Sequence, residues 1–287
     1  MPRLYLDQDA VIRLGSKSPE SAEVAQRIAD GGLTLVLSPA HWLDTAEGAS
    51  DDASREFARF MDSLQPKWLR ERTRLFRLEC QEFLEGAQFE KVTQRAVCRS
   101  VADLVADIGG LDGGGAPIVD SETMVTNLRR DQNSRRILEN SYHQVAESAE
   151  CNRMFFRIGK ITTEVELRAR TIILYRFSGV LEGSEEHFRL QQAPPKALRA
   201  LNCEWEATKW YWRQSVGLTP DRLRDLFHLI VAMSHVDFIL TYDQNLRTMI
   251  AEVAAHVRFP VATVVGSVGE LVDAVELHQE LNAGCLG

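Results

Sequence analysis

The sequence predicts an α/β protein: a three-layer α/β/α domain with a parallel sheet, carrying a large and mainly helical insertion. Two observations predict this class. Short β-prone apolar runs alternate with helical segments at both ends of the chain, which is the pattern of strands paired in parallel through right-handed crossovers. From about residue 55 to residue 214 the sequence instead reads as mostly helical, with long charged amphipathic segments.

The strands and helices at the two ends can be assigned in order from their apolar periodicity. The N-terminal end opens as β-α-β, with a strand RLYL at 3–6, a helix, and a strand LTLVLS at 33–38. After residue 214 follow a helix at 221–235, the strand DFILTY, a helix from Asn245, the strand VATVV and a last helix. We therefore assign residues 1–54 and 215–287 to one domain and residues 55–214 to the inserted region, part of which completes the core.

Composition excludes several classes of protein. With 287 residues, 45% of them apolar and 26% charged, the chain is typical of globular proteins. No apolar window approaches the roughly 20 residues that cross a bilayer, and Asp7 and Asp9 interrupt the first apolar run, so no membrane anchor or signal peptide is expected. The five cysteines are far apart and form no CxxC pair, which is typical of reduced thiols and predicts a cytoplasmic protein.

The net charge of −8 argues against a protein that binds nucleic acid mainly through bulk basic charge. It does not argue against a nuclease, because an acidic metal site adds negative charge of its own. The best candidates for phosphate contacts are the basic tracts KWLRERTRLFR and NLRRDQNSRR. The glycine-rich loop DIGGLDGGGAP has no following GKS or GKT, so a phosphate-binding P-loop is not predicted.

Four aspartates fall where a parallel sheet gathers its ligands, at the carboxyl ends of the strands. Asp7 closes the first strand and Asp243 closes the DFILTY strand, while Asp44 lies on the helix expected after LTLVLS. Asp225 lies near the start of the helix that precedes DFILTY. Converging carboxylates repel one another unless cations occupy the space between them, and Mg²⁺ prefers such oxygen ligands.

Three stretches resemble the motifs of PIN-domain nucleases. LYLDQDAVIRL is similar to the opening motif, in which an aspartate ends the first strand, and LVLSPAHWLDTAEG is similar to the second motif, a turn into a helix. DLFHLIVAMSHVDFILTYDQNL resembles the third and fourth motifs together, and it is the most specific of the three. The resemblance covers about residues 1–50 and 215–287 and leaves the middle of the chain unassigned.

The resemblance implies a PIN-like fold and a metal-dependent nuclease, expected to be an endoribonuclease, that hydrolyses RNA or single-stranded nucleic acid to 5′-phosphate and 3′-hydroxyl ends. It implies that Mg²⁺ or Mn²⁺ ions activate water and stabilise charge on the phosphate. The implied catalytic metal ligands are Asp7, Asp44, Asp225 and Asp243, supported by Asp9, Glu47 and Thr241. The second acid of the family is usually glutamate, so Asp44 and Glu47 both stay open for that role.

Other partners and other readings of the site stay open. A homodimer and a protein inhibitor are open as partners, and no membrane partner is expected. The aromatic cluster of Trp205, Tyr211 and Trp212 could stack unpaired bases, although packing within the insertion is the more ordinary role. His228, on an apolar helix, is read as a core histidine rather than a ligand.

Two rival functions remain. The run LYLDQDAV also fits the opening of haloacid dehalogenase-type phosphatases, with Asp7 as nucleophile, Asp9 as acid/base and Ser38 as a phosphate contact. That class requires a lysine ahead of its final acidic motif, and no lysine occurs between Lys209 and Asp243. The other rival is a non-catalytic PIN-like module that binds RNA or a protein, in which each aspartate is a turn former or a helix-end charge.

Overall fold

The structure is a computed structural model of the whole chain. It describes residues 1–15, 19–48, 50–86, 89–109, 111, 117–139, 179–181, 183–213 and 220–284. Of the helices in these ranges, none combines the length and the apolar character needed to cross a bilayer.

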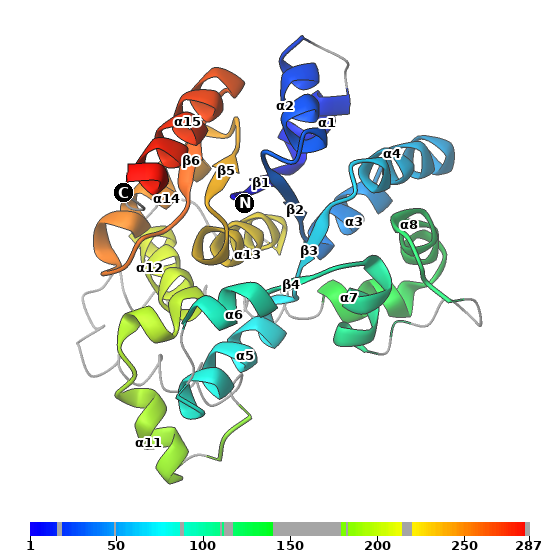
Figure 1. Ribbon diagram of the computed structural model, residues 1–287. Helices are drawn as coiled ribbons and strands as arrows, with labels where there is room; N and C mark the ends of the chain where they lie inside the picture. Colours follow the sequence, from blue (N-terminus) through cyan, green and yellow to red (C-terminus); the bar gives the residue numbers. More distant parts are fainter. Residues whose placement is uncertain are drawn as a thin grey trace.

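The core of the fold is a six-stranded sheet with the order β4-β3-β2-β1-β5-β6 (Figure 1). All neighbouring strands are parallel except β3 and β4, which pair antiparallel. The predicted α/β class with a mostly parallel sheet is therefore confirmed. The strands are β1 (Arg3–Leu6), β2 (Thr34–Leu37), β3 (Lys67–Leu69), β4 (Val97–Cys98), β5 (Phe238–Leu240) and β6 (Thr263–Val265).

The strand order reverses beside β1, at the centre of the sheet. From β1 the chain proceeds outward through β2 and β3, whereas β5 pairs on the other side of β1 and is followed outward by β6. Such a switch point leaves a crevice outside the carboxyl ends of the two central strands, where ligands bind in open α/β sheets. In this chain those ends are Leu6 of β1 and Leu240 of β5, which lie side by side in the ladder.

Alternate side chains of the strands are buried in two separate apolar cores, one on each face of the sheet. Leu4 and Leu6 are buried in one core and Tyr5 in the other, as expected when successive side chains of a strand point to opposite faces. Helices cover both faces (Figure 1), so the molecule has three layers.

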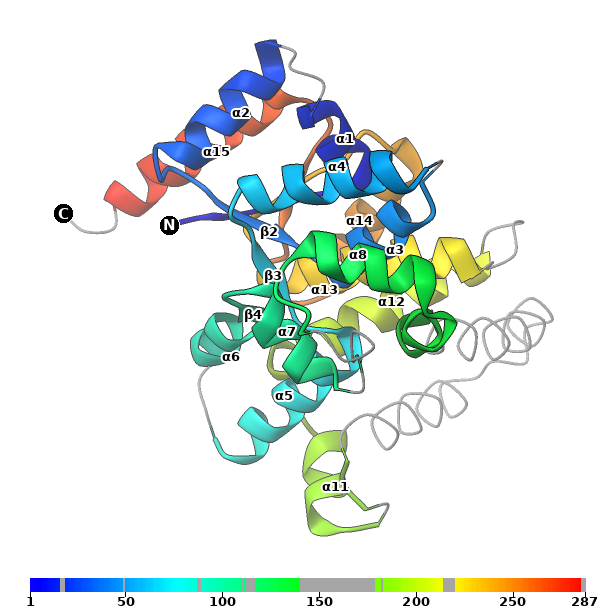
Figure 2. The same cartoon turned by 90° about the vertical axis from the view of Figure 1, so that its right-hand side faces the viewer.

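The helices divide between the two faces as follows. The face of Leu4 is covered by α1 (Gln8–Gly15), α2 (Pro19–Ala29), α3 (Pro39–Ala46), α4 (Asp51–Ser63), α7 (Val101–Ile108), α8 (Ser121–Arg130) and α15 (Val268–Gly284). The face of Tyr5 is covered by α5 (Arg72–Leu84), α6 (Phe89–Arg95), α11 (Glu185–Gln191), the 3-10 turn η1 (Pro195–Ala197), α12 (Arg199–Arg213), α13 (Pro220–His235) and α14 (Gln244–His256). Figure 2 shows α8 beside α3 and α4, and α12 against α13.

The region assigned to the insertion, residues 55–214, contributes directly to the sheet. Where it is described it is mostly helical, and it also supplies β3 and β4 beside β2. β3 is held by its neighbours, because Trp68 is almost fully buried and its ring lies 4.5 Å from that of Trp42 on α3. The helix α4 runs through the boundary drawn at residues 54 and 55, so this boundary does not coincide with a break in the fold.

A buried ion pair joins α5 to α12 on the Tyr5 face. Both side chains are only 5% exposed, and the Arg72 guanidinium donates to both carboxylate oxygens of Glu204. Removing one partner of such a pair leaves an uncompensated buried charge, which costs more than replacing both partners by apolar side chains.

We therefore expect Arg72→Met to lower the free energy of unfolding by about 3–5 kcal/mol, and the double variant Arg72→Met, Glu204→Met to recover most of that loss. Urea denaturation of the wild type, both single variants and the double variant measures this directly. A single variant as stable as wild type, or a double variant less stable than either single, contradicts the assignment.

Candidate functional site

Asp7 is the residue that ends β1, and its position is fixed by the ladder with β5. Its backbone N–H donates to the carbonyl of Leu240 at 3.0 Å. One carboxylate oxygen, Oδ1, accepts from the N–H of Gln8 at 2.8 Å, and the other, Oδ2, accepts from the hydroxyl of Thr241 at 2.8 Å. The carboxylate is therefore held in one orientation at the switch point of the sheet.

Burial raises the pKa of Asp7 above its usual value. The hydrogen bonds from Thr241 and Gln8 oppose this effect, and the negative charges of Asp9 and Asp243 add to it. The convergence of Asp7 with Asp44, Asp225 and Asp243 stays a prediction.

Asp243 lies just beyond β5 and begins α14. Its Oδ1 accepts from the backbone N–H groups of Asn245 and Leu246, at 2.7 and 3.2 Å, and so caps the helix. Its own N–H donates to the hydroxyl oxygen of Thr241 at 3.2 Å. Thr241 is fully buried. Its single hydroxyl group bonds both the carboxylate of Asp7 and the backbone of Asp243.

The two candidates for the second acid lie on α3 and have different surroundings. Asp44 is a half-buried residue on the second turn of the helix. Glu47 follows the last turn, is exposed, and forms an ion pair with Arg135 at 2.5 Å. The carboxylate of Glu47 is therefore engaged by a cation of the chain itself.

Asp225, the fourth predicted ligand, lies on the second turn of α13. Its side chain lies outside the described residues, as do the side chains of residues 214–227 generally. Within the described part of the chain, no group of three or more His, Cys, Asp or Glu residues is arranged to hold a metal ion. The structure thus links Asp7 and the backbone of Asp243 through Thr241, while the described ligands Asp7, Asp44 and Asp243 do not form a group that could hold a metal ion. The four-carboxylate cluster stays a prediction.

A buried polar group lies behind this edge of the sheet, around Ser38. The Ser38 hydroxyl is 3.0 Å from the Tyr5 hydroxyl and 3.0 Å from Nδ1 of His228. Burial lowers the pKa of His41 to about 4, so that its ring is neutral near pH 7. Nε2 of His41 donates to the carbonyl of Leu6 at 2.9 Å, and Nδ1 accepts from the Ser38 N–H at 3.2 Å. His228 is thus bound within the protein, in agreement with its reading as a core histidine.

Two arginines on α1 and α14, the helices that begin at this edge of the sheet, were not among the residues singled out in the sequence. The guanidinium of Arg13, on α1, lies 3.8 Å from the centre of the Tyr242 ring. The guanidinium of Arg247, one turn into α14, packs directly on Gly266 after β6 and lies 3.5 Å from Glu270. Their signal in the sequence was weak, since it consisted only of a cation four residues after Asp243 and one six residues after Asp7.

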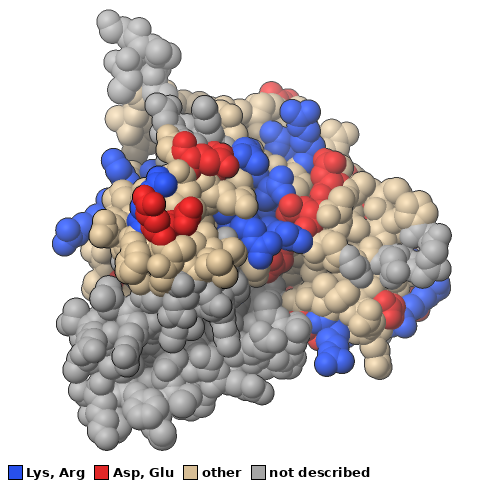
Figure 3. Space-filling view, turned by 90° about the horizontal axis from the view of Figure 1, so that it is seen from below, with Lys and Arg blue, Asp and Glu red and all other residues tan. Residues whose placement is uncertain are grey.

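Four of the eight arginines in the two basic tracts form ion pairs within the chain. Arg70 pairs with Asp107, Arg72 with Glu204, Arg129 with Asp51, and Arg135 with Glu47 and Glu139. Figure 3 shows basic and acidic side chains interleaved on one face of the molecule. The basic tracts therefore do not add up to a uniformly positive surface in the part of the chain that the structure describes.

The aromatic cluster on α12 is largely part of the core. Trp205 is 7% exposed and Tyr211 is 9% exposed, so neither presents a free ring face to a nucleic-acid base. The ordinary packing role is therefore confirmed for these two residues. The side chain of Trp212 lies outside the described residues.

The chain matches no family model, and no significant match is found among curated proteins or among solved structures.

The raised pKa of Asp7 predicts how its substitution changes stability. Because the folded state raises this pKa, the ionised carboxylate destabilises the fold above that pKa, and this cost disappears below the unfolded value of about 3.9. In the absence of divalent cations, we expect Asp7→Asn to be more stable than wild type at neutral pH, by a margin that shrinks as the pH is lowered towards that value.

Urea unfolding in EDTA across this pH range measures the margin. Asp273→Asn, on an exposed position of α15, serves as the control and should show no such margin. An Asp7→Asn variant that is less stable than wild type at neutral pH would contradict the electrostatic description of the site.

Proposed function

We propose that this chain is a metal-dependent nuclease of the PIN-domain type, an endoribonuclease acting on RNA or single-stranded nucleic acid at the carboxyl edge of the sheet. The single observation that carries the proposal is the Thr241 hydroxyl, which bonds Asp7 and the backbone of Asp243 at the switch point. Asp7 and Asp243 are separated by most of the sequence, and a chain that needed only turn formers at these positions would not require one buried hydroxyl to bond both residues.

The carboxylates at this edge are the type of ligand that a hard divalent cation such as Mg²⁺ or Mn²⁺ takes. The carboxylates supply oxygen donors only, which these ions prefer. Burial and neighbouring negative charges disfavour the ionised form of Asp7, and a bound cation would reverse this effect. The metal would be held by Asp7, Asp44, Asp225 and Asp243, and when bound it supplies a more acidic water and stabilises charge on the phosphate.

The described side chains keep acceptor capacity for a cation. Each oxygen of Asp7 accepts one hydrogen bond and has a second lone pair available. Oδ1 of Asp243 caps α14, whereas no described residue donates to Oδ2 of Asp243. Thr241 fixes the carboxylate of Asp7 in place, the role that hydrogen-bonding groups around metal ligands usually have.

We assign the second acid to Asp44 because of its place on α3, and Glu47, which pairs with Arg135 just beyond that helix, stays the alternative. Asp44 is half-buried and lies one turn nearer to the start of α3, which follows the carboxyl end of β2. Asp9, exposed on α1, adds negative charge near Asp7 and is assigned a supporting role.

Substrate contact is proposed to be local to this edge. Because four arginines of the basic tracts are engaged in ion pairs, two arginines on helices that begin at this edge are added as candidates for phosphate contacts. These are Arg13 beside Tyr242 and Arg247 beside Gly266.

The phosphatase alternative is less well supported. Its phosphate contact, Ser38, is 3% exposed, and its hydroxyl is engaged with Tyr5 and His228. The alternative of a non-catalytic binding module is separated from a nuclease by a cleavage assay on the purified protein.

Asp243→Asn tests the catalytic role without disturbing the helix, because asparagine caps helices about as well as aspartate. We expect wild type to cleave a fluorescent single-stranded RNA with Mn²⁺ or Mg²⁺ and not with EDTA, and Asp243→Asn to cleave at least about 100-fold more slowly. Mn²⁺ should also raise the melting temperature of wild type, because only the folded chain assembles the site.

Asp273→Asn is the matched control and should cleave like wild type. Wild type without metal-dependent cleavage favours the binding module, and trapping of an aspartyl-phosphate at Asp7 favours the phosphatase. An Asp243→Asn variant as active as wild type removes Asp243 from the catalytic site.

Thr241→Val tests the positioning role of the hydroxyl, since valine has a similar shape without the hydrogen-bonding group. Burying the N–H of Asp243 without its acceptor should cost about 1–3 kcal/mol in stability, and the rate of cleavage should fall at saturating Mn²⁺. Thr241→Ser keeps the hydroxyl and should restore cleavage. If the Thr241→Val and Thr241→Ser variants cleave the RNA equally fast, Thr241 has only a packing role.

A further inference from the structure

A cleft of about 590 Å³ opens at the other edge of the sheet, at the amino ends of β1, β5 and β6. Its polar lining includes Arg3, Thr93, Arg199, Asp237, Thr263 and His278. The volume lies within the range of small-molecule sites. Because Arg3 begins the strand that Asp7 ends, the cleft is separated from the carboxyl edge by the length of the sheet.

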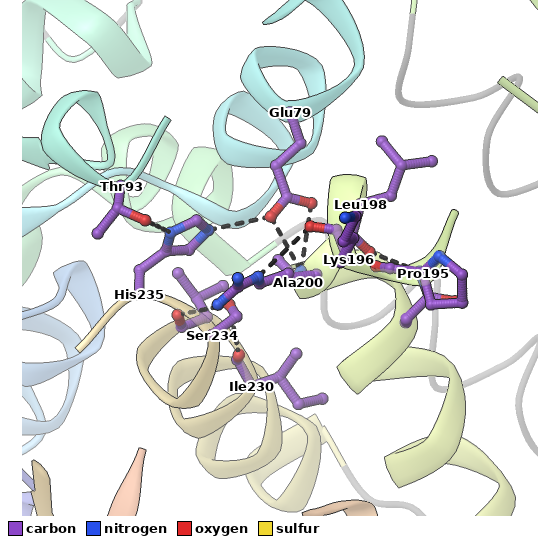
Figure 4. A network of polar contacts seen from close by, with 12 residues as sticks. Glu79, Thr93, Pro195, Lys196, Leu198, Ala200, Ile230, Ser234 and His235 are labelled. Carbon is purple, nitrogen blue, oxygen red and sulfur yellow. Dashed lines mark hydrogen bonds and ion pairs between the residues drawn. The ribbon is translucent and has the colours of Figure 1, made fainter. Parts of the chain in front are cut away.

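The cleft borders a buried network that fixes its shape (Figure 4). Glu79 of α5 is fully buried, and its two oxygens accept from the N–H of Ala200, in the first turn of α12, at 3.0 and 3.2 Å. Glu79 also lies 3.0 Å from Nε2 of His235, at the end of α13. A carboxylate can only accept, so Nε2 carries the proton and Nδ1 faces the Thr93 hydroxyl at 3.5 Å.

This network holds Arg3 at the wall of the cleft. Nη1 of Arg3 donates to the carbonyls of Thr93 and His235, at 2.6 and 3.3 Å. Neither Nε nor Nη2 of Arg3 has an acceptor among the described residues. The guanidinium is thus fixed in place with part of its donor fork still available.

The charge of Arg3 is incompletely compensated. Burial lowers its pKa, and the attraction of Asp237 opposes this effect only in part. Oδ2 of Asp237 accepts instead from the backbone N–H of Arg3 at 2.7 Å. An anion in the cleft would complete the compensation, and guanidinium groups bind carboxylate and phosphate oxygens through two donors at once.

A second cation and an apolar surface accompany Arg3. Arg199 begins α12, reaches the carbonyls of Lys196 and Pro260 through long bonds of 3.4 and 3.5 Å, and lies over the Phe259 ring. Pro260 and Val261 provide accessible apolar surface in the same cleft. The lining therefore combines fixed positive charge with a surface for an apolar body.

We propose that this cleft is a binding site for a small organic anion, whose phosphate or carboxylate group is held by Arg3 and Arg199 and whose apolar body packs against Pro260 and Val261. The site is distinct from the carboxylates at the opposite edge and does not depend on the nuclease proposal.

Isothermal titration calorimetry of the full chain in EDTA tests the site, because EDTA removes any divalent cation through which the carboxylates of the opposite edge could bind a phosphate. The probes are adenosine 5′-monophosphate against adenosine, and indole-3-acetate against indole-3-acetamide, so that each anion has a neutral counterpart. We expect at least one anion to bind about tenfold or more tightly than its counterpart, the difference made by one charge-assisted hydrogen bond. Preference for adenosine 5′-monophosphate indicates a phosphate ligand, and preference for indole-3-acetate indicates a carboxylate ligand.

Arg3→Gln and Arg199→Gln should each weaken that anion about tenfold or more, whereas Arg130→Gln, at an exposed position of α8, should not. Glutamine at position 3 keeps a donor for the carbonyl of Thr93, and a melting temperature near that of wild type verifies that each variant is folded. If neither anion is preferred over its neutral counterpart, or if both arginine variants bind as wild type does, the proposal is overturned.

Discussion

The parallel pairing of β1 with β5 is the constraint on which both ends of the molecule depend. At the amino end of this ladder, Asp237 accepts from the N–H of Arg3 through its carboxylate and donates its own N–H to the carbonyl of Arg3. At the carboxyl end, Asp7 donates to Leu240 and accepts from Thr241. One pair of short strands therefore places a fixed guanidinium at one edge of the sheet and a fixed carboxylate at the other.

The carboxylates of Asp7 and Glu79 differ in how far their surroundings stabilise the ionised form. At the carboxyl edge, like charges are brought together and burial disfavours the ionised form of Asp7. On the other side of the sheet, Glu79 is buried but satisfied, since a helix N-terminus and an imidazole both face it. A bound cation would favour the ionised form of Asp7. Glu79 instead finds its hydrogen-bond donors within the chain, and it holds α12 and His235 in place.

The sequence was sufficient to predict the strands and helices that carry a strong apolar pattern. β1, β2, β5 and β6 and the helices α13 to α15 all follow from such patterns, and so does the position of Asp7 and Asp243 at strand ends. The strands β3 and β4 did not follow, because KWL and VC are too short to show a period and are held by contacts such as that of Trp68 with Trp42. The pairing of Glu47 with Arg135 depends on a tertiary contact that the sequence does not show. The burial of Glu79 was also not predictable, because a glutamate in a charged helical segment is expected to be exposed.

The ladder between β1 and β5 also governs the order in which the chain can fold. Leu4 pairs with Phe238, so the central strand lacks one of its two neighbours until synthesis has passed that residue. During this time the edge of β1 exposes unpaired backbone groups, which favour aggregation. Contacts of such long sequence separation also slow folding, because the loop must close before the pairing is gained. The nascent chain is therefore expected to need protection by chaperones until β5 has emerged from the ribosome.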